Sequence, residues 1–257
     1  MRAPLVLLLL AGCASVPPEE LVWSTPLAQN LRLQFGESVD IASFSRQRPG
    51  PVGPPWEPFF VLRGNTPTKY ELVELDGTVA LEAQAEDGGS GLYRKIRIDP
   101  RRHPVIEFRW RVPAREEGES PLQVASRASP MMRISLAFHG DTAKLDFDDR
   151  TKLRLAKMLT VNGLPYASLL YAWKLGDPVG AVVHSPHSDR VRMIVAESGA
   201  QRVGEWVTVR RNVLEDYRRA FGEEPGDIVA VGLMTDPGDD WSRRRGYYGD
   251  ITFRSAP

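Results

Sequence analysis

Cysteine is almost missing from this 257-residue chain, since Cys13 is the only one. A single thiol cannot form an internal disulfide, so the fold must be stabilised by burial of its core. Net charge is missing as well, because 33 Lys and Arg side chains balance 33 Asp and Glu side chains. A neutral chain of this kind indicates neither a nucleic-acid partner nor an acidic membrane surface as a partner.

Long apolar runs and enzyme signatures are also absent. The apolar run from Leu5 to Leu10 is far shorter than the ~20 residues that a membrane-spanning helix needs. The sequence has no GxSxG elbow, no HExxH and no GxxxxGK[ST] phosphate loop. It therefore gives no direct indication of a hydrolase, zincin or P-loop NTPase.

The first thirteen residues carry the most specific local signal. A positive start, Met1-Arg2-Ala3-Pro4, precedes the apolar run, and the small residues Ala11 and Gly12 precede Cys13. The tetrad Leu10-Ala11-Gly12-Cys13 resembles the bacterial lipobox. The resemblance implies cleavage before Cys13, lipid attachment at its sulfur as a membrane anchor, and, with Ala14 next, an outer-membrane destination. An ordinary signal peptide with a coincidental cysteine is the alternative.

These features divide the chain into a signal peptide (1–12), a lipid-anchored tether (13–35) and one β domain (36–257). From about Tyr70 onward, apolar and polar residues alternate in short segments separated by turns, which is typical of strands buried on one face. The expected strands are 70–75, 78–85, 92–98, 105–112, 131–138, 169–175, 190–197, 206–210, 228–234 and 249–253. We therefore expect an all-β, antiparallel, jelly-roll-like sandwich of the kind found in carbohydrate-binding modules.

Two short helices are expected to connect strands of this sandwich. The first should begin at Asp148 or Asp149 and end near Leu159. The second should begin near Asn212 and stop at Gly222.

Several separated motifs then resemble one bacterial family of unknown function, DUF3047. They are Tyr70-Glu71-Leu72, Ser90-Gly91-Leu92-Tyr93, Phe108 to Val112, Glu205-Trp206-Val207, Arg211 to Gly222, Leu233 to Asp236 and Tyr247 to Ile251. The resemblance covers nearly everything after residue 36. It implies an exported β-sandwich with no assigned reaction.

Candidate ligand contacts gather in one loop near the C-terminus. Asp236, Asp239 and Trp241, with Tyr248 in the following strand, combine carboxylates that accept sugar hydroxyls with rings that stack on sugars. A solvated loop with self-compensating charges is the alternative.

Asp250 is the candidate metal ligand, by analogy with sugar-binding sandwiches that hold a structural calcium near their last strand. Calcium needs six to eight oxygens, so Asp40 would have to help if the N-terminal strand pairs beside it. The alternative is that Asp250 accepts hydrogen bonds from loop backbone. No other cofactor is expected.

Two further groups each allow two interpretations. Tyr171 and Trp173 share one strand face and could form a sugar platform, although core packing is favoured because Leu169 and Leu175 share that face. The second group consists of arginines on the polar faces of strands: Arg109, Arg111, Arg133 and Arg192. They could form a cationic strip that binds an acidic glycan, or they could be exposed residues that pair with Glu107 and Glu197.

The function that these observations favour is an envelope lipoprotein without catalytic activity that binds a carbohydrate or another envelope component. A glycan hydrolase or lyase using paired carboxylates such as Asp236 and Asp250 is one alternative. A structural lipoprotein that binds another protein is the other. The sequence leaves the oligomeric state open.

Overall fold

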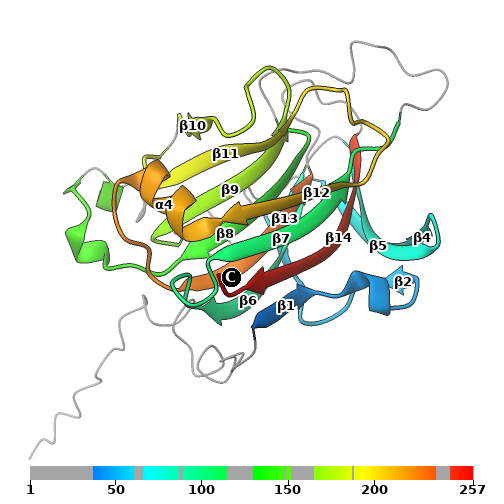
Figure 1. Cartoon of the computed structure of the whole chain (residues 1–257), viewed down its shortest axis with the longest axis horizontal. Coiled ribbons are helices and arrows are strands. Elements are labelled where there is room, and N and C mark those ends of the chain that lie inside the picture. The colour runs from blue at the N-terminus through cyan, green and yellow to red at the C-terminus, as the bar shows by residue number, and fades with distance from the viewer. Residues whose placement is uncertain are drawn as a thin grey trace, which may run out of the picture.

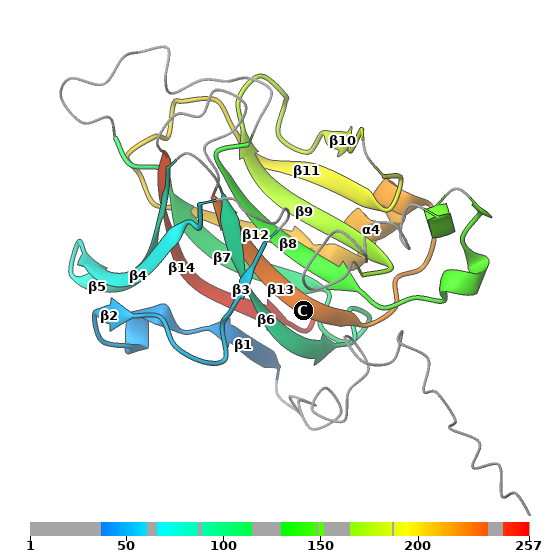
Figure 2. The same ribbon diagram turned by 180° about the vertical axis from the view of Figure 1, so that it is seen from behind.

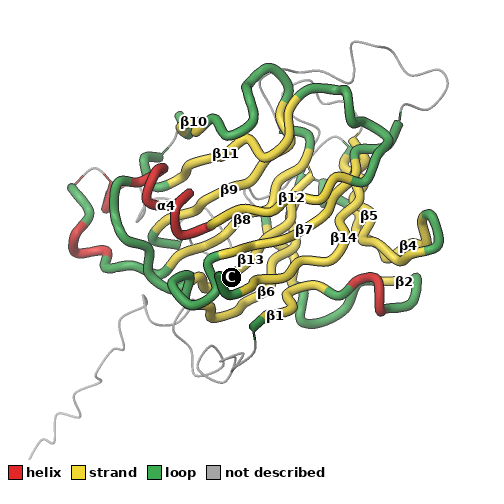
Figure 3. The backbone as a smooth tube through the Cα atoms, in the orientation of Figure 1, coloured by secondary structure: helices red, strands yellow, loops and turns green. Residues whose placement is uncertain are grey.

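The computed structural model describes residues 37–60, 66–86, 89–114, 130–147, 149–151, 165–186, 188–235 and 244–256. These residues form two β-sheets packed face to face, with little helix (Figures 1 and 3). The expected signal peptide and tether, including Cys13, lie outside the described residues. Within the described part of the chain, no helix is long and apolar enough to cross a bilayer.

One sheet, here sheet 1, is antiparallel throughout. Its strands run in the order β12 (Val207–Asn212), β7 (Val105–Arg111), β14 (Arg244–Arg254), β5 (Thr78–Ala85), β4 (Lys69–Leu75) and β2 (Gly50–Pro51), and β1 (Ser38–Ala42) pairs with the C-terminal half of β14.

The other sheet, sheet 2, is nearest the viewer in Figure 2. Its order is β10 (Val182–His184), β11 (Val191–Ser198), β9 (Ala167–Lys174), β8 (Met132–Phe138), β13 (Ile228–Thr235), β6 (Ser90–Ile98) and β3 (Glu57–Phe59). The pair β9–β11 is parallel, which departs from the expected antiparallel pattern. β10 lies two strand positions away from β9, and β11 then pairs with both of them from the position in between.

The expected sandwich is therefore confirmed, and each of the ten expected strands is present with its ends shifted by a few residues at most, except that β14 begins earlier. Outside the ten expected ranges lie β1, which is the N-terminal strand considered for Asp40 and pairs with β14, and the strands β2, β3 and β10. Three of these are only two or three residues long, too short to show an alternating pattern.

Aromatic side chains hold the two sheets together. Phe108 of β7 lies 6.0 Å from Tyr171 of β9, and Trp110 lies 6.0 Å from Trp173, measured between ring centroids. All four rings are almost completely buried. Tyr171 and Trp173 are thus core residues, as the favoured interpretation of that strand predicts.

Helix α4 (Val213–Phe221) closes one side of the sandwich between β12 and β11, and matches the expected second helix. The Asn212 side chain accepts a hydrogen bond from the Glu215 N–H, and Gly222 ends the helix in the left-handed region at φ 71°. The described residues also include two short 3-10 helices, η1 (Phe44–Arg46) and η3 (Thr142–Lys144).

Only the start of the expected first helix is described, at residues 147 and 149–151. Its N-terminal cap is Asp146, whose Oδ1 accepts a 2.7 Å hydrogen bond from the Asp149 N–H. The expected cap at Asp148 or Asp149 is therefore wrong by two or three residues. In an acidic cluster, sequence alone does not distinguish which carboxylate occupies the capping position.

Candidate functional site

Three of the predicted ligand residues, Asp236, Asp239 and Trp241, lie outside the described residues, and so does the lipid-attachment residue Cys13. Those ligand contacts remain predictions. The strands on either side of that loop are described: β13 ends at Thr235 and β14 begins at Arg244.

Tyr248, the fourth predicted ligand contact, lies in the interior. Its side chain has no exposed surface, and its hydroxyl lies 2.8 Å from both the Met234 carbonyl and the Thr235 hydroxyl. Burial raises the pKa of the Tyr248 phenol to about 12. Because this face of β14 points into the core, Tyr248 joins β14 to the end of β13 and has no surface that a ligand could touch.

The carboxylate of Asp250 holds a turn. One oxygen accepts the Ser45 N–H at 2.9 Å and the other accepts the Ser45 hydroxyl at 2.5 Å, which fixes η1 to β14. Asp40 does lie on the neighbouring strand, but it accepts from the Thr252 hydroxyl and faces Arg46. Among the described residues, no group of three or more His, Cys, Asp or Glu side chains is placed to hold a metal ion.

The four arginines expected on one sheet face are divided between the two sheets. Arg109 and Arg111 belong to β7 of sheet 1, whereas Arg133 and Arg192 belong to β8 and β11 of sheet 2. Arg192 is buried, pairs with Asp189 at 3.1 Å and lies 5.8 Å from the Phe221 ring. A single strip of all four is therefore excluded by the strand order.

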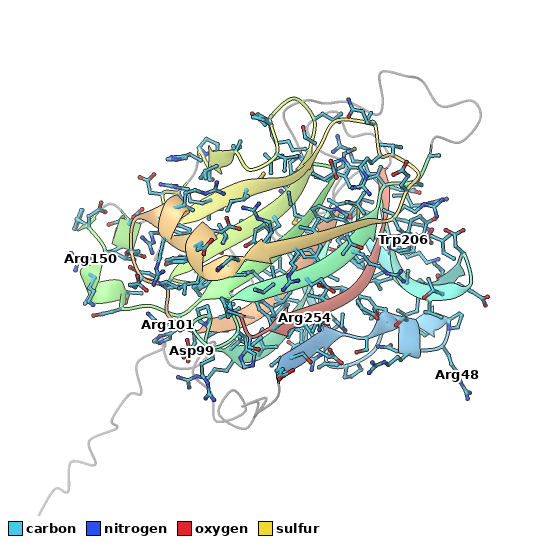
Figure 4. All side chains as sticks on the ribbon, viewed as in Figure 1. Arg48, Asp99, Arg101, Arg150, Trp206 and Arg254 are labelled. Atoms are coloured by element: carbon cyan, nitrogen blue, oxygen red, sulfur yellow. The ribbon has the colours of Figure 1, made fainter. Side chains whose placement is uncertain are left out.

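The outer face of sheet 1 nevertheless brings together the most distinctive polar group of the described residues. The Arg109 guanidinium stacks on the indole of Trp206, with its Cζ 4.7 Å from the ring centroid. Trp206 immediately precedes β12, which pairs with β7 so that Val207 lies opposite Trp110. Figure 4 labels Trp206 on this side of the molecule. We call this pair the Trp206–Arg109 stack.

The β4–β5 hairpin contacts the same face. Its two-residue turn, Asp76-Gly77, has positive φ at both positions, as the Asp-Gly sequence predicts for a tight hairpin. Asp76 accepts a hydrogen bond from Arg111, and Thr78 accepts one from Arg109 at 3.3 Å. Because β14 lies between β7 and β5, both arginines reach across it.

Gly249 of β14 allows that crossing. A Cβ atom at this position would lie only 2.4 Å from Cγ of Arg109 and 2.6 Å from its Nε. The β14 bulge between Tyr248 and Ile251 places Gly249 there. The glycine of the Tyr-Tyr-Gly-Asp-Ile motif thus provides space for an arginine on the neighbouring strand.

A second row of polar groups continues the face towards β4. Glu82 is buried, accepts a hydrogen bond from Gln84 and lies 3.5 Å from Nε of Arg245. Burial, with the hydrogen bond to Glu82, raises the pKa of Tyr247. Tyr247 lies opposite both Glu82 and Arg111 in the strand register, so the two rows are contiguous.

Two N–H donors in this region are buried without an acceptor, the Trp206 Nε1 and the Arg111 Nε. A buried donor without a partner costs about 1–3 kcal/mol. Three further donors of this kind occur elsewhere in the described residues, the core indole of Trp110 among them, so these two donors do not by themselves mark a ligand site.

Sequence reasoning found only part of this site. It assigned Arg109 and Arg111 to a polar strand face, but it treated Trp206 as a strand residue within a motif. The signal that links the two is the β7–β12 register, which no local pattern gives.

Comparison with known proteins adds a family and a loose structural likeness. A family model described as "Protein of unknown function (DUF3047)" matches residues 54–252. No curated protein matches the chain.

Among solved structures, the chain is similar to the family 11 carbohydrate-binding module of the cellulase Lic26A-Cel5E of Clostridium thermocellum, with 11% identity, a TM-score of 0.42, and coverage of 85% of this chain and 95% of that one. It is also similar to the family 30 module of Cel9D-Cel44B from the same organism, with 10% identity, a TM-score of 0.35, and coverage of 85% and 97%. At such scores the likeness carries no argument about a ligand.

Proposed function

Because the chain belongs to the DUF3047 family, whose description names no function, we propose a function from its own structure: it is a non-catalytic module that binds a carbohydrate of the cell envelope on the outer face of sheet 1. The observation that carries this proposal is the Trp206–Arg109 stack.

The chemistry of this face suits a sugar. Sugars present flat C–H faces that pack on aromatic rings, and hydroxyls that exchange hydrogen bonds with charged and amide groups. Trp206 is partly exposed, and among the described residues no other ring packs against it. Glu82, Gln84 and Arg245 supply the neighbouring polar groups.

The predicted lipid anchor fits this placement and forms part of the proposal. Cys13 would carry the lipid in the outer membrane, with the domain facing the periplasm or the cell surface. The tether would enter the domain at β1, whose Ser38 pairs with Arg254 at the C-terminal end of β14. Gly249, which the Arg109 side chain crosses, lies five residues back along β14 from Arg254, roughly 16 Å at the usual rise of a strand. The site would therefore lie away from the anchor.

Binding to immobilised envelope and plant polysaccharides tests the proposal, with the purified full-length chain in detergent. Trp206→Ala should weaken binding about tenfold, the size of one lost aromatic contact, and Trp206→Phe should retain part of it. The control Arg210→Ala removes an exposed arginine from β12 on the same side of the sheet and should change binding little.

If no polysaccharide binds, or if Trp206→Ala binds like the unmodified chain, this function is wrong. Release of sugar from any polysaccharide would favour the hydrolase or lyase alternative. Capture of a stoichiometric protein partner together with failure to bind glycans would favour the structural lipoprotein.

A further inference from the structure

Arg109 differs from Arg111 and Arg245 on the same face because neither of its partners is charged. Arg111 pairs with Asp76, and Arg245 lies 3.5 Å from Glu82. The contacts of Arg109 are with the Thr78 hydroxyl and the Trp206 ring, neither of which is charged. Among these three arginines of the described face, Arg109 is therefore the one that has no carboxylate partner.

The position of this unneutralised charge is well defined. The aliphatic part of Arg109 crosses Gly249, its Nη2 donates to Thr78, and its Cζ lies over the Trp206 ring. Three contacts from three different strands or their flanks fix the side chain. Because these contacts already restrict the side chain, little conformational entropy is lost when a ligand binds to it.

The donors that Arg109 still has free fit an acidic group. A guanidinium carries five N–H donors, and the Thr78 hydroxyl uses one of them. Two parallel N–H groups of a guanidinium match the two oxygens of a carboxylate in spacing and charge. A neutral hydroxyl uses only one donor and leaves the charge uncompensated.

We propose that this site is selective for acidic glycans, and that Arg109 binds the carboxylate of a uronic acid unit. The inference rests on the proposed function, since it names the class of sugar for the same face. Trp206 then has two roles: it contacts sugar, and it positions Arg109.

Matched pairs of polysaccharide test this selectivity. Polygalacturonate and its fully methyl-esterified form share one backbone and differ in carboxylate charge, as do alginate and hyaluronate and their carboxyl-reduced forms. The unmodified chain should bind each acidic form about tenfold or more tightly than its neutral counterpart, the size of one charge-assisted bidentate contact. Raising the ionic strength should reduce that preference.

Variants of Arg109 separate charge from geometry. Arg109→Gln should abolish the preference for the acidic form, and Arg109→Lys should keep part of it because lysine retains the charge without the planar fork. Arg210→Gln removes an exposed arginine that makes none of these contacts and should leave the preference unchanged. The ratio of the two affinities is insensitive to the fraction of folded protein, so a destabilised variant remains informative.

The outcomes distinguish the two proposals. Equal binding of acidic and neutral forms, or a preference that survives Arg109→Gln, would overturn acidic selectivity while the carbohydrate-binding function stands. Failure to bind any glycan, acidic or neutral, would remove both.

Discussion

At the scale of single residues, the face of sheet 1 depends on a missing side chain as much as on those present. Gly249 lies beneath Arg109, and the nearest atoms to an added Cβ are the inner atoms of the arginine, which cannot move aside easily. A methyl group there would push Arg109 away from Thr78 and Trp206.

Gly249→Ala should therefore reduce the preference for acidic glycans to the level of Arg109→Gln, without loss of the fold. The same substitution at Gly53 is the control, because a Cβ there meets nothing within 4 Å. Binding of the polygalacturonate pair measures the effect. If Gly249→Ala keeps the preference for the acidic polysaccharide, the space at Gly249 is not what positions Arg109.

A second residue-scale feature is the buried carboxylate of Asp216 in α4. It accepts two hydrogen bonds from Arg211 at 2.9 and 2.6 Å, one from Arg219 at 3.1 Å and one from the Tyr171 hydroxyl at 3.0 Å. Desolvation, followed by the charge of Asp216, raises the pKa of Tyr171 well above its ordinary value. These contacts tie the helix to the ends of both sheets, so their role is structural.

Asp216→Asn should lower the free energy of unfolding by about 3 kcal/mol, since it leaves Arg211 partly buried without its counter-charge. Glu215→Gln, at an exposed position on the same helix, should change it by less than about 0.5 kcal/mol. Urea unfolding at neutral pH measures both. Similar stabilities for the two variants would contradict the assigned role of Asp216.

At the scale of elements, a network joins the start of β11 to the segment after α4. Arg190, just before β11, donates to Glu223 at 2.5 Å, and the hydroxyls of Tyr217 and Tyr166 donate to the same carboxylate at 2.9 and 3.2 Å. Arg190 also lies 4.1 Å from the Tyr166 ring centroid. Desolvation opposes the charge on Glu223, but these hydrogen bonds outweigh it, so the pKa of Glu223 is lowered from 4.5.

A carboxyl whose pKa is lowered in the folded state stabilises the fold above its unfolded pKa. That contribution is lost as the pH falls below about 4.5 and through the folded value. The melting temperature of the unmodified chain should thus fall more between pH 6 and pH 3 than that of Glu223→Gln. Glu205→Gln, which removes an exposed carboxylate, should behave like the unmodified chain. If the melting temperatures of all three proteins fall by the same amount between pH 6 and pH 3, Glu223 has no such role.

At the scale of the whole molecule, the two sheets enclose an aromatic core, α4 closes one side, and the proposed site occupies an outer face. The tether would join beside the C-terminal end of β14, whereas Gly249, under Arg109, lies in the middle of that strand. The proposed lipid anchor would decide whether the chain stays at a membrane, and it is testable without any knowledge of the ligand.

Cys13→Ser should abolish incorporation of an alkyne-labelled fatty acid and move the chain from the membrane fraction to the soluble fraction of a Gram-negative host. Replacement of Ser15 by Ala, two residues away, is the control and should leave both unchanged. Equal labelling of the Cys13→Ser chain, or a chain that is soluble without the substitution, would remove the anchor from the proposal.

The sequence by itself determined the strands, the tight hairpin at Asp76-Gly77 and the extent of α4. Each of these depends on residues close together in the chain: alternation that buries every second side chain, a turn that needs positive φ, and a cap at either end of a helix. The fold class followed because several such strands can bury their apolar faces only against another sheet.

Only the tertiary structure decided which polar residues meet. Arg109 and Trp206 are almost a hundred residues apart, and their contact depends on the register between β7 and β12 and on the bulge that places Gly249 between β7 and β5. Tyr248 and Asp250 are two residues apart in one strand, yet the Tyr248 hydroxyl lies in the interior beside the Thr235 hydroxyl, and Asp250 accepts hydrogen bonds from Ser45 in η1. Strand register is set by the packing of the whole core rather than by neighbouring residues, and a shift of one residue would reverse every side chain that forms this site.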